Sequence, residues 1–393
     1  MSHPMVRAAV RSQRAGRDAG VCSFAGRPPA TVDTPLLAAG DLHGRLRSEF
    51  PKLDYAIRSA ADVEAVVALG RRLPSVVCAA MGDSANPVAV ARDASAAIEH
   101  MTRRLLELAV DRLGSPPVPW AWLALGSAAR HEQSFLTDQD HALAFDPTGA
   151  RFDDVDRYFL QVARSVSSGL EAAGIPRCHA DVVAETRSLR RPIAHWEAAF
   201  SEWIEDPRLE AGRQASILFD LRRVAGPLDA ERALDPIIGS ASRRPRFLRR
   251  MAIQSLDVPP PAKRPRRFAV VRRAPEKAAL DVKHHALTPI VNLARSYALE
   301  AGVSGAGTLA RLAGAAARGR IDAETRIALT EAFQLVWGVR LEHHVSCVEG
   351  GTTPDDFIDP RMLDPSTRLR LEGALGTVRR AQAELRGVHG LRA

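Results

Sequence analysis

The stretch from residue 120 to residue 145, WAWLALGSAARHEQSFLTDQDHALAF, is the part of the chain that most constrains its fold. It begins with a short apolar run, 120–125, which is closed by Gly126 and therefore suits a buried strand. Ser127 is a favourable helix N-cap, and a second apolar run occupies 142–145. The pattern predicts a strand, a tight turn, one or two turns of helix and a second strand.

The polar residues of this stretch indicate phosphate and metal chemistry. A turn at a helix N-terminus, here Gly126 and Ser127, presents unpaired backbone N–H groups and suits a polyphosphate. Asp138 and Asp140 are two residues apart, so on a strand both carboxylates point to one face. They would repel each other without a cation between them, and Mg²⁺ prefers such oxygen ligands together with substrate phosphates. The arrangement is the one that nucleotidyl transfer needs, although a solvated acidic turn beside a plain helix start is the alternative.

Three segments resemble a known family. Residues 126–140, GSAARHEQSFLTDQD, resemble the Gly-Ser … Asp-x-Asp signature of the polymerase-β-like nucleotidyltransferase superfamily. Within it, the chain is most similar to the nucleotidyltransferases related to the protein-PII uridylyltransferase, which bacteria often fuse to CBS or cyclic-nucleotide-binding domains. Residues 216–226, SILFDLRRVAG, resemble the close of that catalytic domain, and residues 279–303 resemble the start of the helical substrate-binding domain that follows it. The resemblance extends roughly from residue 60 to the C-terminus.

The resemblance implies roles for individual residues. The metal, Mg²⁺ or Mn²⁺, would be held by Asp138 and Asp140, and the nucleoside triphosphate (NTP) would be bound by Gly126, Ser127, Arg130, Lys283 and Arg295. The family's acceptor is a side-chain hydroxyl of a regulatory protein of the PII type. The chain shows neither a phosphohydrolase motif that would remove the nucleotide nor an evident sensor domain.

A third carboxylate commonly helps this superfamily to bind metal or to activate the nucleophile. Asp181 is one candidate, because it lies in 178–185, a candidate third strand. Asp220 is the other, because it matches a family position; a structural ion pair with Arg222 or Arg223 is its alternative role.

Patterning predicts an α+β fold in which a small mixed-sheet nucleotidyltransferase domain is flanked by helices on both sides. We expect a disordered Arg-rich tail over 1–40, an N-terminal helical region over 41–115, the catalytic domain over 116–235 and a helical substrate-binding domain over 236–393. Apolar periodicity predicts helices over 88–113 and 153–173, and a C-terminal bundle with helices over 288–301, 307–318, 323–347 and 366–385.

Composition indicates which partners and which cellular location to expect for the protein. The net charge of +8 comes almost wholly from arginine, because the chain of 393 residues holds four lysines. Two basic clusters, 243–250 and 263–273, would contact phosphates or an acidic partner, or else form a solvated surface between domains. No aromatic-interleaved recognition module accompanies the charge, so nucleic acid is not an expected partner. Scattered cysteines without metal-ligand spacing and the lack of a recognisable membrane span predict reduced thiols, a cytoplasmic location and no membrane association.

Three functions remain open from the sequence. The first is transfer of NMP from an NTP to a hydroxyl of a protein. The second is nucleotidyl transfer to a small molecule, of the antibiotic-modifying type, because those enzymes also place a helical bundle after the catalytic domain. The third is a nucleotide-binding signalling regulator without catalysis.

Overall fold

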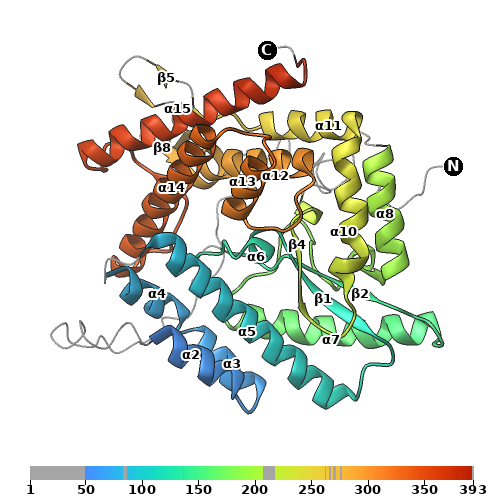
Figure 1. Ribbon diagram of the computed structural model, residues 1–393. Coiled ribbons are helices and arrows are strands. Elements are labelled where there is room, and N and C mark those ends of the chain that lie inside the picture. The colour runs from blue at the N-terminus through green and yellow to red at the C-terminus, as the bar shows by residue number, and fades with distance from the viewer. Residues whose placement is uncertain are drawn as a thin grey trace.

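A computed structural model describes residues 49–391, apart from 83–85, 136, 207–216, 262, 265–266, 269–270 and 275–276. The predicted tail over 1–40 lies outside the described residues. Helices dominate the structure, and a small sheet lies between them (Figure 1). The predicted α+β class is confirmed.

The central sheet consists of β1 (Trp120–Leu125), β2 (His141–Phe145), β3 (Arg190–Pro192) and β4 (Leu221–Ala225). Its strand order is β3-β2-β1-β4. β1 pairs antiparallel with both β2 and β4, whereas β2 pairs parallel with β3. The sheet is therefore mixed, as predicted.

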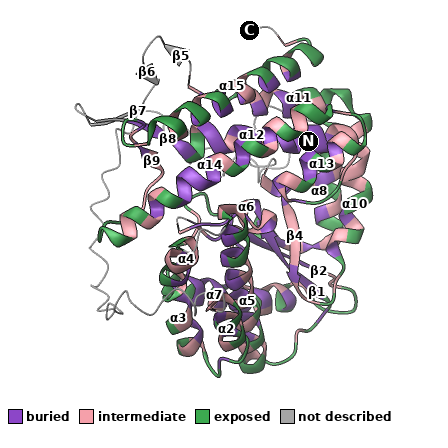
Figure 2. Ribbon diagram, turned by 60° about the vertical axis from the view of Figure 1, so that its left-hand side comes forward, coloured by how far each residue is buried: buried purple, intermediate pink, exposed green. Residues whose placement is uncertain are grey.

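Helices cover both faces of the sheet. Trp120 and Trp122 of β1 pack in one core with α5 (Pro87–Leu113) and α7 (Phe152–Ala172). Leu123 and Leu125, which follow along the strand, pack on the opposite face with α8 (Ile193–Glu205) and α10 (Ala230–Ser240). Because successive side chains of a strand point to opposite faces, two covered faces require an unbroken apolar run. All six residues of β1 are buried, in agreement with this requirement (Figure 2).

The N-terminal helices pack on the α5–α7 side of the sheet. They are α2 (Glu49–Arg58), α3 (Val63–Gly70) and α4 (Leu73–Gly82), followed by α5. α5 begins after Asn86, whose side chain accepts a hydrogen bond from the N–H of Val88, with Pro87 in the first turn. It ends at Leu113, as predicted, and Gly114 follows as its C-cap.

One stretch of the described residues, Val63–Gly82, is long and apolar enough by composition to cross a membrane, contrary to our reading of the sequence. In the structure it is two helices, α3 and α4, which are interrupted at Arg71 and Arg72. Val66 and Val76 of these helices belong to the same apolar core as β1.

The C-terminal half forms the predicted bundle, whose helices lie together at the top of Figure 1. Its helices are α11 (Pro245–Leu256), α12 (Thr288–Ala301), α13 (Thr308–Ala317), α14 (Ala323–Glu349) and α15 (Pro365–Val388). The four predicted C-terminal helices are confirmed to within three residues at each end. Short strands precede or accompany the bundle: β5 (Lys263–Arg264), β6 (Arg267–Phe268), β7 (Val271–Ala274), β8 (Lys277–Asp281) and β9 (Phe357–Ile358).

Two local predictions are wrong. Residues 178–185 form bends and turns instead of a third strand, and Asp181 adopts a left-handed conformation with φ +56°. The strand next to β2 is β3, nine residues after Asp181. Ser127 is not the N-cap of the helix after β1, because α6 (Gly126–Arg130) already starts at Gly126 and Leu125 occupies the N-cap position.

Candidate active site

The turn after β1 brings Gly126 against the carboxylate of Asp140. Gly126 has φ +54°, and its N–H donates to the carbonyl of Asp220 at 3.0 Å. A Cβ on this residue would lie 2.9 Å from Asp140 Oδ2. Both the left-handed conformation and the close approach therefore require glycine at this position.

Asp138 and Asp140 lie in an extended segment that leads into β2, and not within the strand itself as predicted. Between them, the backbone of Gln139 forms a parallel bridge with Arg177. The amide of Gln139 is buried and donates to the carbonyls of Ile175 (2.7 Å) and Ser167 (3.1 Å). This anchor turns Gln139 toward α7 and leaves the two carboxylates together on the other side.

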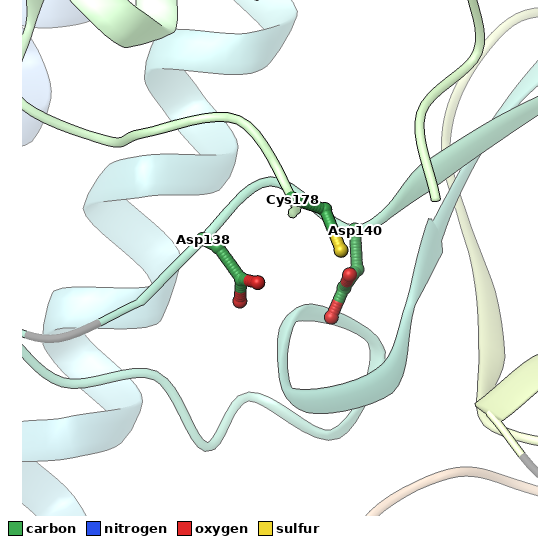
Figure 3. A group of neighbouring side chains, drawn as sticks. All are labelled: Asp138, Asp140 and Cys178. Atoms are coloured by element: carbon green, nitrogen blue, oxygen red, sulfur yellow. The ribbon is translucent and has the colours of Figure 1, made fainter. Parts of the chain in front are cut away.

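Cys178 completes a group of three potential metal ligands. One ligand atom from each of Asp138, Asp140 and Cys178 lies within 4.8 Å of the other two. Figure 3 shows the three side chains converging next to the turn after β1. The sequence analysis did not select Cys178, because no metal spacing marks it and its place depends on the bridge between Gln139 and Arg177.

The electrostatics of this group favour a bound cation. Burial, and next the negative charge of Asp138, raise the pKa of Asp140 to about 7, whereas Cys178, Arg130 and Lys283 act in the opposite direction. Burial and the nearby Asp140 charge raise the pKa of the Cys178 thiol to about 12. A divalent cation would offset the charge repulsion, and two carboxylates suit Mg²⁺ or Mn²⁺. The donor set therefore fits the predicted metal.

Asp220 does not join this group. Its side chain is fully buried and accepts hydrogen bonds from Arg130, Arg295 and Arg311. Burial alone would raise the pKa of Asp220, but the three guanidinium groups hold it well below its usual range. Arg311 also donates to the carbonyl of Phe219 at 2.8 Å. Asp220 thus forms ion pairs, as its alternative role predicted, but with arginines other than Arg222 and Arg223.

Asp181 also lies outside the ligand group. It is exposed, and it occupies the turn that follows Cys178. Among the described residues, the third potential ligand near the two aspartates is therefore a thiol and not a carboxylate.

Arg130 and Arg295 face Asp220 instead of open solvent. Arg130 also pairs with Glu132 through Nε at 2.7 Å, and Glu132 accepts from the N–H of Thr308 at the start of α13 at 2.9 Å. These contacts fasten the segment after β1 to the C-terminal bundle. The positive charge of Arg130 also acts on Asp140, although both arginines are already paired with Asp220.

Lys283 is an exposed cation whose charge acts on one of the two carboxylates. It lies in a π-helical turn, Lys283–Leu287, which immediately precedes α12. Its charge acts on Asp140, and within the described part of the chain its ammonium group has no ion-pair partner. π-Helical turns are frequent at functional sites, and this one carries the lysine whose charge acts on Asp140.

Comparison with known families agrees with the predicted class of protein. Residues 71–210 match the family described as "Putative nucleotidyltransferase DUF294", and residues 245–388 match the "Putative nucleotidyltransferase substrate binding domain". The chain belongs to this nucleotidyltransferase family. The first matched segment contains α4 to α8 with three of the four strands of the sheet, and the second contains the C-terminal bundle. No curated protein matches the chain.

Proposed function

We propose that the protein is a metal-dependent nucleotidyltransferase that moves NMP from an NTP to an acceptor hydroxyl. The observation that carries this proposal is the convergence of Asp138, Asp140 and Cys178 beside the turn at Gly126. Family membership supports the general activity.

Each residue of the site would have its own role in the reaction. Asp138 and Asp140 would hold Mg²⁺ or Mn²⁺, which supplies charge neutralisation on the triphosphate and on the leaving pyrophosphate. Gly126 and Ser127 would bring the backbone close to the phosphates, and the exposed ammonium of Lys283 would pair with one of them. Arg130 and Arg295, both paired with Asp220, would supply positive potential and hold the turn in place.

The reaction exchanges one bond to phosphorus for another. The acceptor oxygen forms a bond to the α-phosphorus, and the bond from that phosphorus to the bridging oxygen breaks. Pyrophosphate leaves with the electron pair, and the hydroxyl proton is released to water. The turn at Gly126 and Lys283 keep the phosphate chain in line for this attack.

We further propose that the acceptor is a side chain of a PII-like regulatory protein and that the reaction takes place in the cytoplasm. The basis is the resemblance to the protein-PII uridylyltransferase relatives. Neither a membrane nor a nucleic acid is part of the proposal.

The test uses α-labelled ATP, GTP, CTP and UTP in turn, with Mg²⁺ or Mn²⁺, in lysate of the source cell. The wild-type protein is compared with the Asp138→Asn, Asp140→Asn double variant, and the labelled products are separated by mass. We expect a labelled macromolecule that requires both aspartates. A labelled small molecule would replace the proposed acceptor by one of the antibiotic-modifying type. Nucleotide binding without any labelled product, in the presence of both metals, would contradict catalysis and leave a nucleotide-binding regulator.

A further inference from the structure

A cavity of about 290 Å³ lies between α11 and the start of α12. It is lined by Met251, Gln254, Ser255, Asp257, Val258, His284, Asn292 and Arg295. Its volume is close to the lower limit of about 300 Å³ for small-molecule sites, which suits one ring system rather than a whole nucleotide.

The unpartnered amide of Gln254 distinguishes this cavity from a simple packing defect. Both its Oε1 and its Nε2 are buried, and neither has a hydrogen-bond partner among the described residues. Buried polar groups are normally paired, so a donor and an acceptor left side by side indicate a missing partner. An amide presents one acceptor and one donor in a fixed plane.

The helix that carries Gln254 is held firmly. Gln382 of α15 donates to the carbonyls of Ser255 (2.9 Å) and Val258 (3.1 Å), and Ser255 bonds to Ser296 of α12 at 2.7 Å. The backbone position of Gln254 is therefore set by its neighbours before any ligand binds.

A short chain of contacts connects the cavity to the candidate active site. Arg295 lines the cavity and binds Asp220, whose carbonyl accepts the N–H of Gly126. His284 lines the cavity, and the adjoining Lys283 acts on Asp140. The same π-helical turn thus reaches both sites.

The charge and shape of the cavity indicate which part of a nucleotide enters it. The guanidinium of Arg295 is already paired with Asp220, so it is not presented to a phosphate. Met251 and Val258 offer apolar surface, and the His284 ring can stack on a planar group. Each nucleobase carries a neighbouring donor and acceptor on one edge, which an amide can match.

We propose that this cavity binds the nucleobase of the NTP and that Gln254 reads its edge. The inference rests on the proposed function and adds the residue that determines base preference.

The experiment measures binding to the full-length protein with Mg²⁺ by calorimetry. The ligands are ATP, GTP, CTP, UTP and inorganic tripolyphosphate, which has no base. We compare the wild type with Gln254→Ala, Gln254→Glu and the matched control Gln161→Ala, whose side chain is exposed on α7. We expect Gln254→Ala to weaken the preferred NTP about tenfold while tripolyphosphate binding is unchanged. Gln254→Glu replaces the donor by an acceptor, so the rank order of the four NTPs should change.

The outcomes separate this inference from the proposed function. The inference is overturned if Gln254→Ala binds the preferred NTP like the wild type, or if it weakens NTP and tripolyphosphate equally. It is also overturned if the wild type binds no NTP more tightly than tripolyphosphate; in all these cases the proposed function stands. Only a wild type that binds neither NTP nor tripolyphosphate would overturn both.

Discussion

Arg295 and Asp220 form a bidentate ion pair that joins the C-terminal bundle to the edge of the catalytic sheet. Nε lies 2.9 Å from Oδ1 and Nη2 lies 2.5 Å from Oδ2. Both side chains are buried, and the carbonyl of the same aspartate holds the N–H of Gly126. The pair therefore connects the bundle directly to the turn beside the candidate metal ligands.

Replacing Asp220 by asparagine should lower the free energy of unfolding by about 3–5 kcal/mol, because it leaves buried guanidinium groups without their counter-charge. Urea unfolding measures the loss. The control is Glu107→Gln, which breaks the exposed pair with Arg104 and should cost less than about 1 kcal/mol. Equal losses in the two variants would show that the buried cluster contributes no more than a surface ion pair.

Replacing Gly126 by alanine should impair both stability and metal binding. The left-handed backbone costs about 1–2 kcal/mol with a Cβ, and that Cβ would also displace the Asp140 carboxylate. Gly149→Ala is the matched control, because Gly149 has φ +81° but open space around its Cβ position. Calorimetry should show weaker Mn²⁺ binding for Gly126→Ala and unchanged Mn²⁺ binding for Gly149→Ala. Unchanged Mn²⁺ affinity in that variant would argue against Asp140 as a ligand.

Replacing Cys178 by serine should change which metal the site prefers. A thiolate favours soft cations, so Cd²⁺ binding should weaken at least about tenfold while Mg²⁺ binding changes little. Calorimetry measures the affinities, and ultraviolet absorption detects a sulfur–cadmium bond in the wild type. Cys78→Ser, in α4, serves as the control. A cadmium band that persists in Cys178→Ser would place the bound ion elsewhere.

Replacing Lys283 by glutamine should weaken the binding of tripolyphosphate about tenfold, because it removes an exposed charge close to the candidate ligands. The effect should shrink as salt is added, since the charge is accessible to ions. Lys52→Gln, an exposed substitution on α2, should leave tripolyphosphate affinity at the wild-type value. Identical affinities in the two variants would remove Lys283 from the site.

His344 should make stability depend on pH between 5 and 7. Its ring is fully buried, with Nε2 3.1 Å from Asp356 Oδ1, and burial lowers its pKa from the ordinary 6.5. Below pH 6.5 the unfolded chain therefore binds a proton that the native protein does not, so stability falls as the pH falls, by at most about 1.4 kcal/mol per pH unit.

Urea unfolding at pH 5, 6 and 7 tests this dependence. His344→Gln should make the slope less steep, because it removes one of several histidines whose pKa is lowered, whereas His343→Gln, at its partly exposed neighbour, should retain the slope. A slope that is the same in His344→Gln as in the wild type would assign the pH dependence to other groups.

Local patterns were sufficient for α5, α7, the last four helices of the C-terminal bundle and the two central strands. The apolar run of β1 and the 3.6-residue periodicity of α5 and of the C-terminal helices depend on which faces are buried, and this is visible in the sequence. The Asp-x-Asp spacing likewise predicted that the carboxylates of Asp138 and Asp140 lie together, and in the structure they do.

The remaining parts of the site depend on contacts between distant segments. Cys178 reaches Asp140 because Gln139 bridges to Arg177, and Arg311 reaches Asp220 across 91 residues. Neither pairing leaves a periodic signal. The strand predicted over 178–185 failed because a run of mixed residues does not reveal the left-handed turn at Asp181.

The arginine cluster around Asp220 also determines how the protein unfolds. The catalytic half alone would keep a buried carboxylate with one of its three guanidinium partners, and the bundle alone would carry Arg295 and Arg311 without a counter-ion. Each half thus depends on the other for charge balance in its interior. The two halves should consequently melt in one cooperative transition, and neither should fold stably when it is expressed separately.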